Sequence, residues 1–575
     1  PSPVSCLLAP EEMHCKTAET RQAEGFYRAW ALDVDDPVQQ VNVAPGGQGE
    51  AVVTWIARER HLPSAVRYAQ AGGYLERVAE GTARVYTTQI CLPNSVVMID
   101  PILGPPNRGF DFSELTARLN TSAFLPKSSD SYRYLRPGQD PWQVVSETNY
   151  CIDYKNPMAF YTSPYIHSVV LPGLHGRTEY SFTPEGSART FAFTTPAEPG
   201  AVTASPFRLG VWADVGITNV SFAVMHEMLR LEPELLLTVG DLSYADGWSK
   251  RWDVFGTMME PLLSGRFHLA VPGNHEITQN NGVDFVNRFP MPFQQSGSES
   301  PYMFSYEAGP TFVLGLPGSY AETGPDSSQW TYASETLASV DRERTPWLVV
   351  MFHTPWYNSN GAHYGEAVKH QWDMEALFYE HGVDVVFNGH IHSYERSFPV
   401  FNNIRDECGM THIVIGDGGN YEGPALYEGG GWREPQPTWS AFREAAYGPG
   451  LLSVFNATHA EWAWHRVACV ESNRHRGRGG DTHYSYGGSR ESLRRTRPTT
   501  AYLWDGVAGP AGGPACSTEG DSSAQRFEAS DRAVLVRDAA RCPNRQGVHK
   551  GRQAAGRRAP SRHTPATRLA GLTPV

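Results

Sequence analysis

The sequence predicts an α/β fold, a layered β-sandwich flanked by helices, preceded by a smaller all-β sandwich domain. Two patterns support this prediction. Before residue 196, short β-rich runs alternate with Gly- and Pro-rich turns, as in small β-sandwiches. After residue 206, apolar runs alternate with amphipathic helical segments, as in α/β folds. A length of 575 residues also favours separate domains, because one hydrophobic core rarely serves more than about 300 residues.

The all-β domain is expected at residues 41–200, after an N-terminal leader at residues 1–40. The turn at 46–50 precedes a strand at 51–56, and further strands are expected at 166–171 and 190–195. The stretch 92–157 interrupts this pattern. It is rich in Pro, Asn, Ser and Tyr with little periodicity, so it is predicted to be a long loop insert.

The α/β domain is expected at residues 201–466, after a linker rich in Pro and Ala. Its apolar runs predict buried strands at Phe207–Ala213, Leu235–Val239, His268–Val271, Thr311–Leu316, Trp347–Phe352, Val383–Phe387 and Thr411–Ile415. Amphipathic segments predict helices at Ser221–Arg230 and Gln371–His381. Sites in α/β folds form at the carboxyl ends of strands, so polar residues there are candidate functional residues.

Charge is unevenly distributed along the chain. The formal charge is −13, but residues 467–575 hold 18 Lys and Arg against 9 Asp and Glu, so the preceding residues carry −22. This basic tail, rich in Arg, Gly, Pro and Ala, is expected to be disordered. The acidic body disfavours specific nucleic acid and membranes as partners, and no run of about 18 apolar residues predicts a membrane span. A homodimer stays open.

Cysteines and glycosylation sequons indicate the compartment. The eight cysteines contain no C-x-x-C pair, which argues against a structural zinc site and leaves disulfides open. Sequons at Asn120, Asn219 and Asn456 favour a glycoprotein that is secreted or vacuolar, with its signal peptide outside this chain.

Metal-ligand residue types follow five of the predicted strands. They are Asp214, Asp241 with Tyr244, Asn274, His353, and His390 with His392. Asp at a strand end is usually only a turn residue, but turns do not require the three histidines. His390 and His392 are two positions apart in a loop, so their rings can reach two neighbouring ions, and the Asp241 carboxylate can bridge them. The set therefore predicts a two-metal site.

In these five blocks the sequence resembles the purple acid phosphatases, members of the wider calcineurin-like metallophosphoesterases. The resemblance extends to residues 440–444 and 462–466 and covers residues 41–466 apart from the insert. It implies a metallophosphoesterase-type sandwich preceded by a fibronectin-like domain. It also implies a ligand set in which Asp214, Tyr244 and His392 bind a ferric ion, Asn274, His353 and His390 bind a divalent ion, and Asp241 bridges the two.

The ligand types favour two different ions. A phenol such as Tyr244 ligates well only as phenolate, which calls for a strongly Lewis-acidic ion such as Fe3+. Asn274 is a neutral donor, so the second site suits Zn2+, Mn2+ or Fe2+. A trivalent and a divalent ion carry five positive charges, and three anionic ligands with one hydroxide supply four negative charges. The cluster therefore keeps a net charge of about +1, which attracts a phosphate dianion. The expected reaction is hydrolysis of small phosphate monoesters at acid pH by a metal-activated hydroxide.

The resemblance also gives two candidates for binding phosphate and protonating the leaving group, His275 and His363. Some family members carry a further histidine before the second of these, where this chain has Ala362. That departure weakens the assignment of the general acid.

Several alternatives stay open. A phosphodiesterase or nucleotide pyrophosphatase of the same superfamily would use the same ligands. A Ser/Thr protein phosphatase shares the Gly-Asn-His-Glu block at 273–276, but this chain continues its second block with Leu-Ser-Tyr instead of Val-Asp-Arg-Gly. A polyanion-binding protein could use the basic tail. If the tail is a divergent extension or a misread gene segment, cutting the chain at Arg466 should leave activity unchanged.

Overall fold

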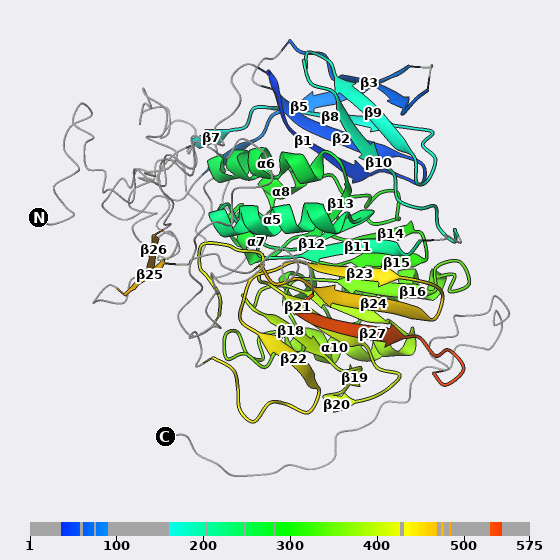
Figure 1. Cartoon of the computed structure of the whole chain (residues 1–575), viewed down its shortest axis with the longest axis vertical. Coiled ribbons are helices and arrows are strands. Elements are labelled where there is room, and N and C mark those ends of the chain that lie inside the picture. Colours follow the sequence, from blue (N-terminus) through cyan, green and yellow to red (C-terminus); the bar gives the residue numbers. More distant parts are fainter. Residues whose placement is uncertain are drawn as a thin grey trace, which may run out of the picture.

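The computed structural model describes residues 36–57, 61–73, 76–89, 160–201, 205–245, 249–280, 282–425, 431–467, 473–476, 482–485 and 529–542. The predicted insert at 92–157 and most of the predicted leader lie outside these residues. The described part contains two large mixed sheets together with helices α5 to α10 (Figure 1). This is the layered α/β arrangement that the sequence predicts.

The larger sheet has ten strands in the order β27-β24-β23-β11-β12-β13-β1-β2-β8-β5. Their bounds are β1 Val38–Pro45, β2 Ala51–Ala57, β5 Thr82–Arg84, β8 Tyr165–Leu171, β11 Phe207–Trp212, β12 Leu235–Val239, β13 Phe267–Val271, β23 Gly450–Val454, β24 His459–Trp464 and β27 Asp531–Val536. The parallel strands β11, β12 and β13 are connected through α5 (Asn219–Leu231) and α6 (Lys250–Leu263). Thr218 begins α5 with a capping box, in which its side chain and that of Ser221 bond each other's backbone N–H.

This sheet crosses the boundary that the sequence predicts between two domains. β1 pairs in parallel with β13, with Val43 opposite Phe267. Every residue of β1 is buried, because the strand has a neighbour on each edge and α6 packs against it. β1 also starts at Val38, inside the predicted leader. The strands of the predicted N-terminal domain therefore extend the sheet of the α/β part.

The rest of the N-terminal region is also all-β. A four-stranded sheet has the order β10-β9-β3-β4, with β3 Ala65–Gln70, β4 Arg77–Glu80, β9 Glu179–Pro184 and β10 Phe191–Thr194, and β6 (Thr87–Gln89) pairs with β7 (Phe160–Thr162). No helix occurs in the described residues before α5. The assignment of this N-terminal region as a fibronectin-like domain stays a prediction.

The second sheet has seven strands in the order β14-β15-β16-β17-β21-β18-β22. Their bounds are β14 Phe304–Ala308, β15 Thr311–Gly315, β16 Trp347–Met351, β17 Val385–Asn388, β18 Tyr394–Ser397, β21 Thr411–Ile415 and β22 Ser440–Glu444. On β16, Val349 and Met351 join the core shared with the larger sheet, whereas Leu348 and Val350 pack with α9 (Ser328–Ser339) and α10 (Val368–Glu380). Both faces are buried, so the strand reads as one apolar run.

Short elements complete the described chain. They are α7 (Asn274–Asn280), α8 (Val283–Arg288), the 3-10 helix η2 (Gly318–Tyr320), and the paired strands β19 (Val400–Phe401) with β20 (Ile404–Arg405) and β25 (Asn473–Arg476) with β26 (Thr482–Ser485). No helix among the described residues combines the length and the apolar character that crossing a bilayer requires.

The expectation that the whole of residues 467–575 is disordered is wrong for the paired strands β25 and β26 and for residues 529–542. β27 pairs antiparallel with β24 along its full length and forms an edge of the larger sheet (Figure 1). A disulfide also joins Cys542 to Cys408. The Arg-rich composition of the tail concealed a six-residue strand whose burial alternates as at a sheet edge.

The same segment inserts a carboxylate into the core of the α/β part. Asp531 accepts hydrogen bonds from Tyr394 Oη at 2.7 Å and from Arg396 Nε at 2.7 Å. Tyr394 is fully buried, stacks on Trp464 at 4.5 Å and accepts a bond from Trp462 Nε1. Cutting at Arg466 would remove the carboxylate partner of a buried tyrosine and a partly buried arginine. The expectation that such a cut is harmless is therefore withdrawn.

Candidate metal centre

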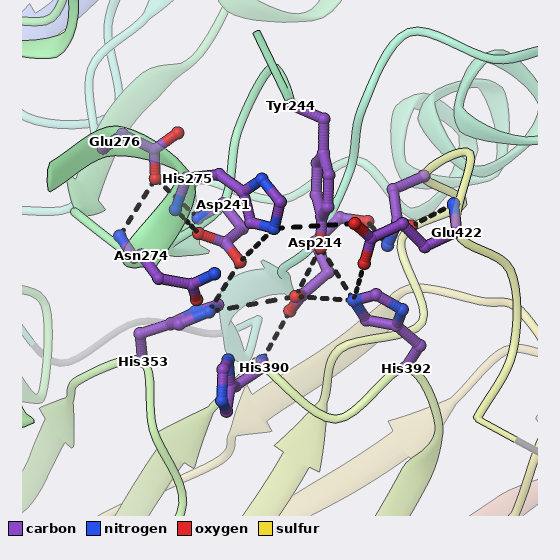
Figure 2. A network of polar contacts seen from close by, with 12 residues as sticks. Asp214, Asp241, Tyr244, Asn274, His275, Glu276, His353, His390, His392 and Glu422 are labelled. Atoms are coloured by element: carbon purple, nitrogen blue, oxygen red, sulfur yellow. Dashed lines mark hydrogen bonds and ion pairs between the residues drawn. The ribbon is translucent and has the colours of Figure 1, made fainter. Parts of the chain in front are cut away.

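The seven predicted ligands meet at the carboxyl ends of the strands (Figure 2). Six lie in the loops after β11, β12, β16 and β17, and Asn274 is the first residue of α7, which follows β13. Four of them have left-handed backbones, with φ of 55° at Asp214, 52° at Asp241, 51° at Tyr244 and 71° at His390. Residues other than glycine seldom adopt this conformation, and such strain concentrates at functional sites.

One half of the cluster consists of Asp214, Tyr244 and His392. Tyr244 Oη lies 2.9 Å from Asp214 Oδ1 and 2.8 Å from His392 Nε2. His392 Nε2 lies 3.4 Å from the same Asp214 oxygen. Donor atoms that share an ion at about 2.1 Å are roughly 3 Å apart, so these three atoms have the spacing of a common ligand set.

The other half consists of Asp241, Asn274, His353 and His390. Asp241, His353 and His390 offer donor atoms that all lie within 4.8 Å of one another. His353 Nε2 lies 2.9 Å from Asp241 Oδ2, but it has no partner with hydrogen-bond geometry in the described part of the chain. Figure 2 shows the Asn274 amide beside His353. A buried nitrogen without a hydrogen bond fits a ligand whose metal completes its coordination.

Backbone carbonyls orient two of the histidines. His353 Nδ1 lies 2.7 Å from the carbonyl oxygen of Val239, and His392 Nδ1 lies 3.1 Å from that of Gly423. A carbonyl only accepts, so each Nδ1 carries the proton and each Nε2 keeps a lone pair directed at the site. This is the tautomer that metal binding needs.

Close packing of the loops requires glycine at two positions. A Cβ on Gly389 would lie 2.5 Å from Asp214 Oδ2, and one on Gly240 would lie 2.5 Å from His353 Nδ1. Gly240 also has a φ of 85°. A side chain at either position would therefore displace a predicted ligand.

Glu276 has a structural role that the sequence analysis did not assign. Its carboxylate accepts the backbone N–H groups of Asp241, Leu242 and Gly273 at 2.8, 2.9 and 2.9 Å. It therefore ties the loop after β12 to the loop after β13. Burial, with the nearby charge of Asp241, raises the pKa of Glu276 to about 7. The position of Glu276 in the Gly-Asn-His-Glu block could have indicated this role from the sequence.

The two predicted outer histidines lie beside the cluster. His275 Nε2 is 3.9 Å from Asp241 Oδ2, and its ring packs 4.0 Å from that of Tyr244. The His363 ring lies 4.1 Å from that of His390, on a side chain that is 45% exposed.

Two further carboxylates border the site and were missed. Glu366 Oε2 lies 2.7 Å from His363 Nδ1 and 3.1 Å from His390 Nε2. Glu422 is 3.9 Å from both His275 Nε2 and His392 Nε2. The three-residue spacing from His363 to Glu366 was a usable signal, but nothing local indicated Glu422.

Protons and metal ions compete for this cluster. Burial opposes protonation of His353, but the charges of Asp241 and Asp214 outweigh it and raise the pKa of His353 to about 9. Burial raises the pKa of Asp241, but the neighbouring His353 and His275 hold it below its usual range. Burial and the nearby Asp214 raise the pKa of Tyr244 well above its usual value. Without a cation the site therefore gathers protons, and a cation of high charge would displace them.

Two family models match this chain. The model of the calcineurin-like phosphoesterases matches residues 208–394, and that of the iron/zinc purple acid phosphatase-like protein C matches residues 409–474. Purple acid phosphatase 18 of Arabidopsis thaliana is 40% identical over 311 residues, which cover 53% of this chain and 69% of the relative. The chain belongs to the purple acid phosphatases.

Other comparisons agree with this membership. Probable purple acid phosphatase 20 of Arabidopsis thaliana is 38% identical over 319 residues, which cover 54% of this chain and 72% of the relative. The solved structure of the purple acid phosphatase PPD1 from yellow lupin (Lupinus luteus) seeds shares the fold, with a TM-score of 0.54 at 19% identity. The match covers 78% of this chain and 74% of the lupin chain. As a purple acid phosphatase, the chain is a metallophosphatase that hydrolyses phosphoesters at a dinuclear metal centre.

Proposed function

We propose that this purple acid phosphatase hydrolyses small phosphate monoesters at acid pH with an Fe(III)–M(II) pair, where M is Zn, Mn or Fe. Asp214, Tyr244 and His392 would hold the ferric ion, Asn274, His353 and His390 the divalent ion, and Asp241 both. The observation that carries this proposal is the position of the Tyr244 hydroxyl, 2.9 Å from Asp214 Oδ1 and 2.8 Å from His392 Nε2.

The electrostatics of that tyrosine favour a trivalent ion. Burial raises the pKa of Tyr244 well above its usual value, so only a strongly polarising cation would stabilise the phenolate. The other half offers a neutral amide and two imidazoles besides the shared Asp241, which suits a divalent ion. When bound, the two ions would neutralise phosphate charge and lower the pKa of a water molecule so that it attacks phosphorus as hydroxide.

Protein groups would supply the remaining chemistry. His275 and His363 are the candidates for binding the phosphate and for protonating the leaving oxygen, since each lies beside a predicted ligand. His275 is buried and packed against Tyr244, whereas His363 is exposed and held by Glu366. The buried residue is therefore the better fixed of the two.

Two features support a secreted or vacuolar location. The Cys408–Cys542 disulfide is typical of oxidising compartments. The sequon at Asn456 lies in an exposed turn between β23 and β24, where a glycan could be attached.

Metal analysis combined with a visible spectrum tests the proposal. Purified protein should contain iron and a second metal, should be violet through phenolate-to-iron charge transfer, and should lose this band in Tyr244→Phe. Rates on an aryl phosphate, a phosphodiester and ATP, measured across pH, separate a monoesterase from a diesterase and a pyrophosphatase. An active enzyme that is colourless and free of iron would refute the assignment.

A further inference from the structure

An exposed guanidinium stacks on the residue that follows His363 in a loop beside the metal centre, although the body of the protein is acidic. The Arg433 guanidinium carbon lies 3.9 Å from the centre of the Tyr364 ring. Tyr364 is 54% exposed and Arg433 is also exposed, so both are open to solvent. These two residues are called the rim pair below.

Backbone pairing holds the rim pair together. Gly361 N donates to the Gly431 carbonyl at 2.7 Å, and Arg433 N donates to the Ser359 carbonyl at 2.8 Å. Residues 359–361 and 431–433 thus form a short antiparallel ladder with a bridge between Asn360 and Trp432. Arg443 also supports the ladder, since its Nη1 donates to the Arg433 carbonyl at 2.9 Å and to Ser359 Oγ at 3.1 Å. The rim pair therefore has a defined position instead of being a chance surface contact.

The rim pair is joined to the metal centre through its own loop. Tyr364 directly follows His363, whose ring lies 4.1 Å from that of His390. Glu366 hydrogen-bonds both histidines and so fixes the loop on the far side of Tyr364. Two ring contacts thus connect the rim pair to a predicted ligand, because Arg433 stacks on Tyr364 and the adjacent His363 packs on His390.

The charge of Arg433 has no counterion in the described part of the chain. The neighbouring Arg443 pairs with Glu434, and Arg396 pairs with Asp531, whereas among the described residues Arg433 forms backbone hydrogen bonds and contacts the Tyr364 ring. Stacking on an aromatic face orients a guanidinium and leaves its N–H fork available. Carboxylates and phosphates match this fork bidentately.

We propose that Arg433, stacked on Tyr364, determines specificity by binding a second anionic group on the leaving part of the substrate. The preferred substrates are then phosphomonoesters whose alcohol carries a carboxylate or another phosphate. This inference rests on the proposed function, because it names the substrate class of the same site. The acidic body strengthens the effect, since the rim pair supplies local positive charge where an anionic leaving group would otherwise be repelled.

Two substrates that differ in the second anion test this inference. 3-Phosphoglycerate carries a carboxylate, whereas p-nitrophenyl phosphate has only the phosphate. In Arg433→Gln, kcat/KM for 3-phosphoglycerate should fall about tenfold, mainly through KM, as for the loss of one charged hydrogen bond. With p-nitrophenyl phosphate the change should stay below about twofold. Arg433→Lys should lower kcat/KM for 3-phosphoglycerate less than Arg433→Gln does, because lysine keeps the charge but lacks the planar fork.

A matched control comes from a similar residue elsewhere. Arg405 is also exposed and lies 3.4 Å over the Phe398 ring, outside the ligand loops. Arg405→Gln should leave the ratio of the two kcat/KM values unchanged. If Arg433→Gln lowers both values equally, or changes neither, the inference is wrong while the proposed function stands. A wild-type protein that hydrolyses neither substrate overturns both.

Discussion

The two halves of the metal centre differ in ligand charge and in surroundings. Asp214, Tyr244 and His392 bring a carboxylate and a phenol within 3.4 Å of one imidazole, in a nearly closed cluster. The half with His353 and His390 offers neutral donors besides the shared Asp241, and its border includes exposed groups. Under the proposed division of ligands, the half with the greater ligand charge would retain a highly charged ion, and the half with neutral donors would hold a divalent ion that exchanges more readily.

Removal of the shared ligand should have the largest effect, because both halves use it. Asp241→Ala should lower kcat on p-nitrophenyl phosphate by on the order of 10³-fold or more, with loss of both ions. Activity and metal content of the purified variant measure this. Asp326→Ala, at an exposed carboxylate outside the ligand loops, is the control. Full metal content in Asp241→Ala would mean that the halves bind their ions independently.

The C-terminal strand gives a way to weaken one half from a distance. Asp531→Ala should lower the free energy of unfolding by about 3 kcal/mol, because Arg396, whose side chain is only 13% exposed, and the buried Tyr394 hydroxyl both lose their carboxylate partner. Since Tyr394 comes two residues after His392, iron release to a chelator should also accelerate. Denaturant unfolding and loss of the violet band measure the two effects.

Arg532→Ala is the matched control on the same strand, because the Arg532–Glu461 ion pair is exposed. It should change stability by less than about 0.5 kcal/mol. Equal effects of the two substitutions would show that the stability depends on the pairing of β27 and not on the buried carboxylate of Asp531.

The two histidines of one loop separate the halves directly. His392→Ala should lose iron and colour, whereas His390→Ala should lose the divalent ion and keep the violet band. Each should lower kcat by about 10²-fold, less than the loss of the shared carboxylate. Metal analysis of the two variants side by side decides the matter. If both variants lose the same ion, the proposed division of ligands is wrong.

Buried histidines outside the ligand set should make the fold sensitive to acid. Burial lowers the pKa of His412, of His370 and of His268 to about 3. Between pH 6.5 and 3 the unfolded chain binds protons that the folded chain does not, so stability is lost as the pH falls below 6.5.

The acid effect can be assigned to single residues. At pH 5 each of these histidines should lower the free energy of unfolding by about 2 kcal/mol relative to neutral pH. In His412→Leu, the difference in unfolding free energy between pH 7 and pH 5, measured by denaturant unfolding, should be smaller than in the wild type by that amount. His61→Leu, at an exposed histidine, is the control and should leave the difference unchanged. A His412→Leu protein with the wild-type pH dependence would show that His412 is protonated in the folded state.

The sequence predicted the elements with strong periodicity. All seven apolar runs of the α/β part are strands within a few residues, because strands buried on both faces leave an unbroken apolar signal. The ligands were found because each follows such a run. Glu366 and Glu422 were missed because long-range loop packing brings them to the site and no local period records it. The β1–β13 pairing joins residues too distant in sequence for a pattern to reveal.

The position of β27 has a consequence for how the protein is made. β24 ends at Trp464 and its partner begins at Asp531, so about 65 residues must be synthesised before this edge of the sheet is paired. At roughly 5–20 residues per second, the nascent chain exposes an unpaired strand for several seconds. A chaperone that shields β24 during that interval would protect the newly made protein from aggregation.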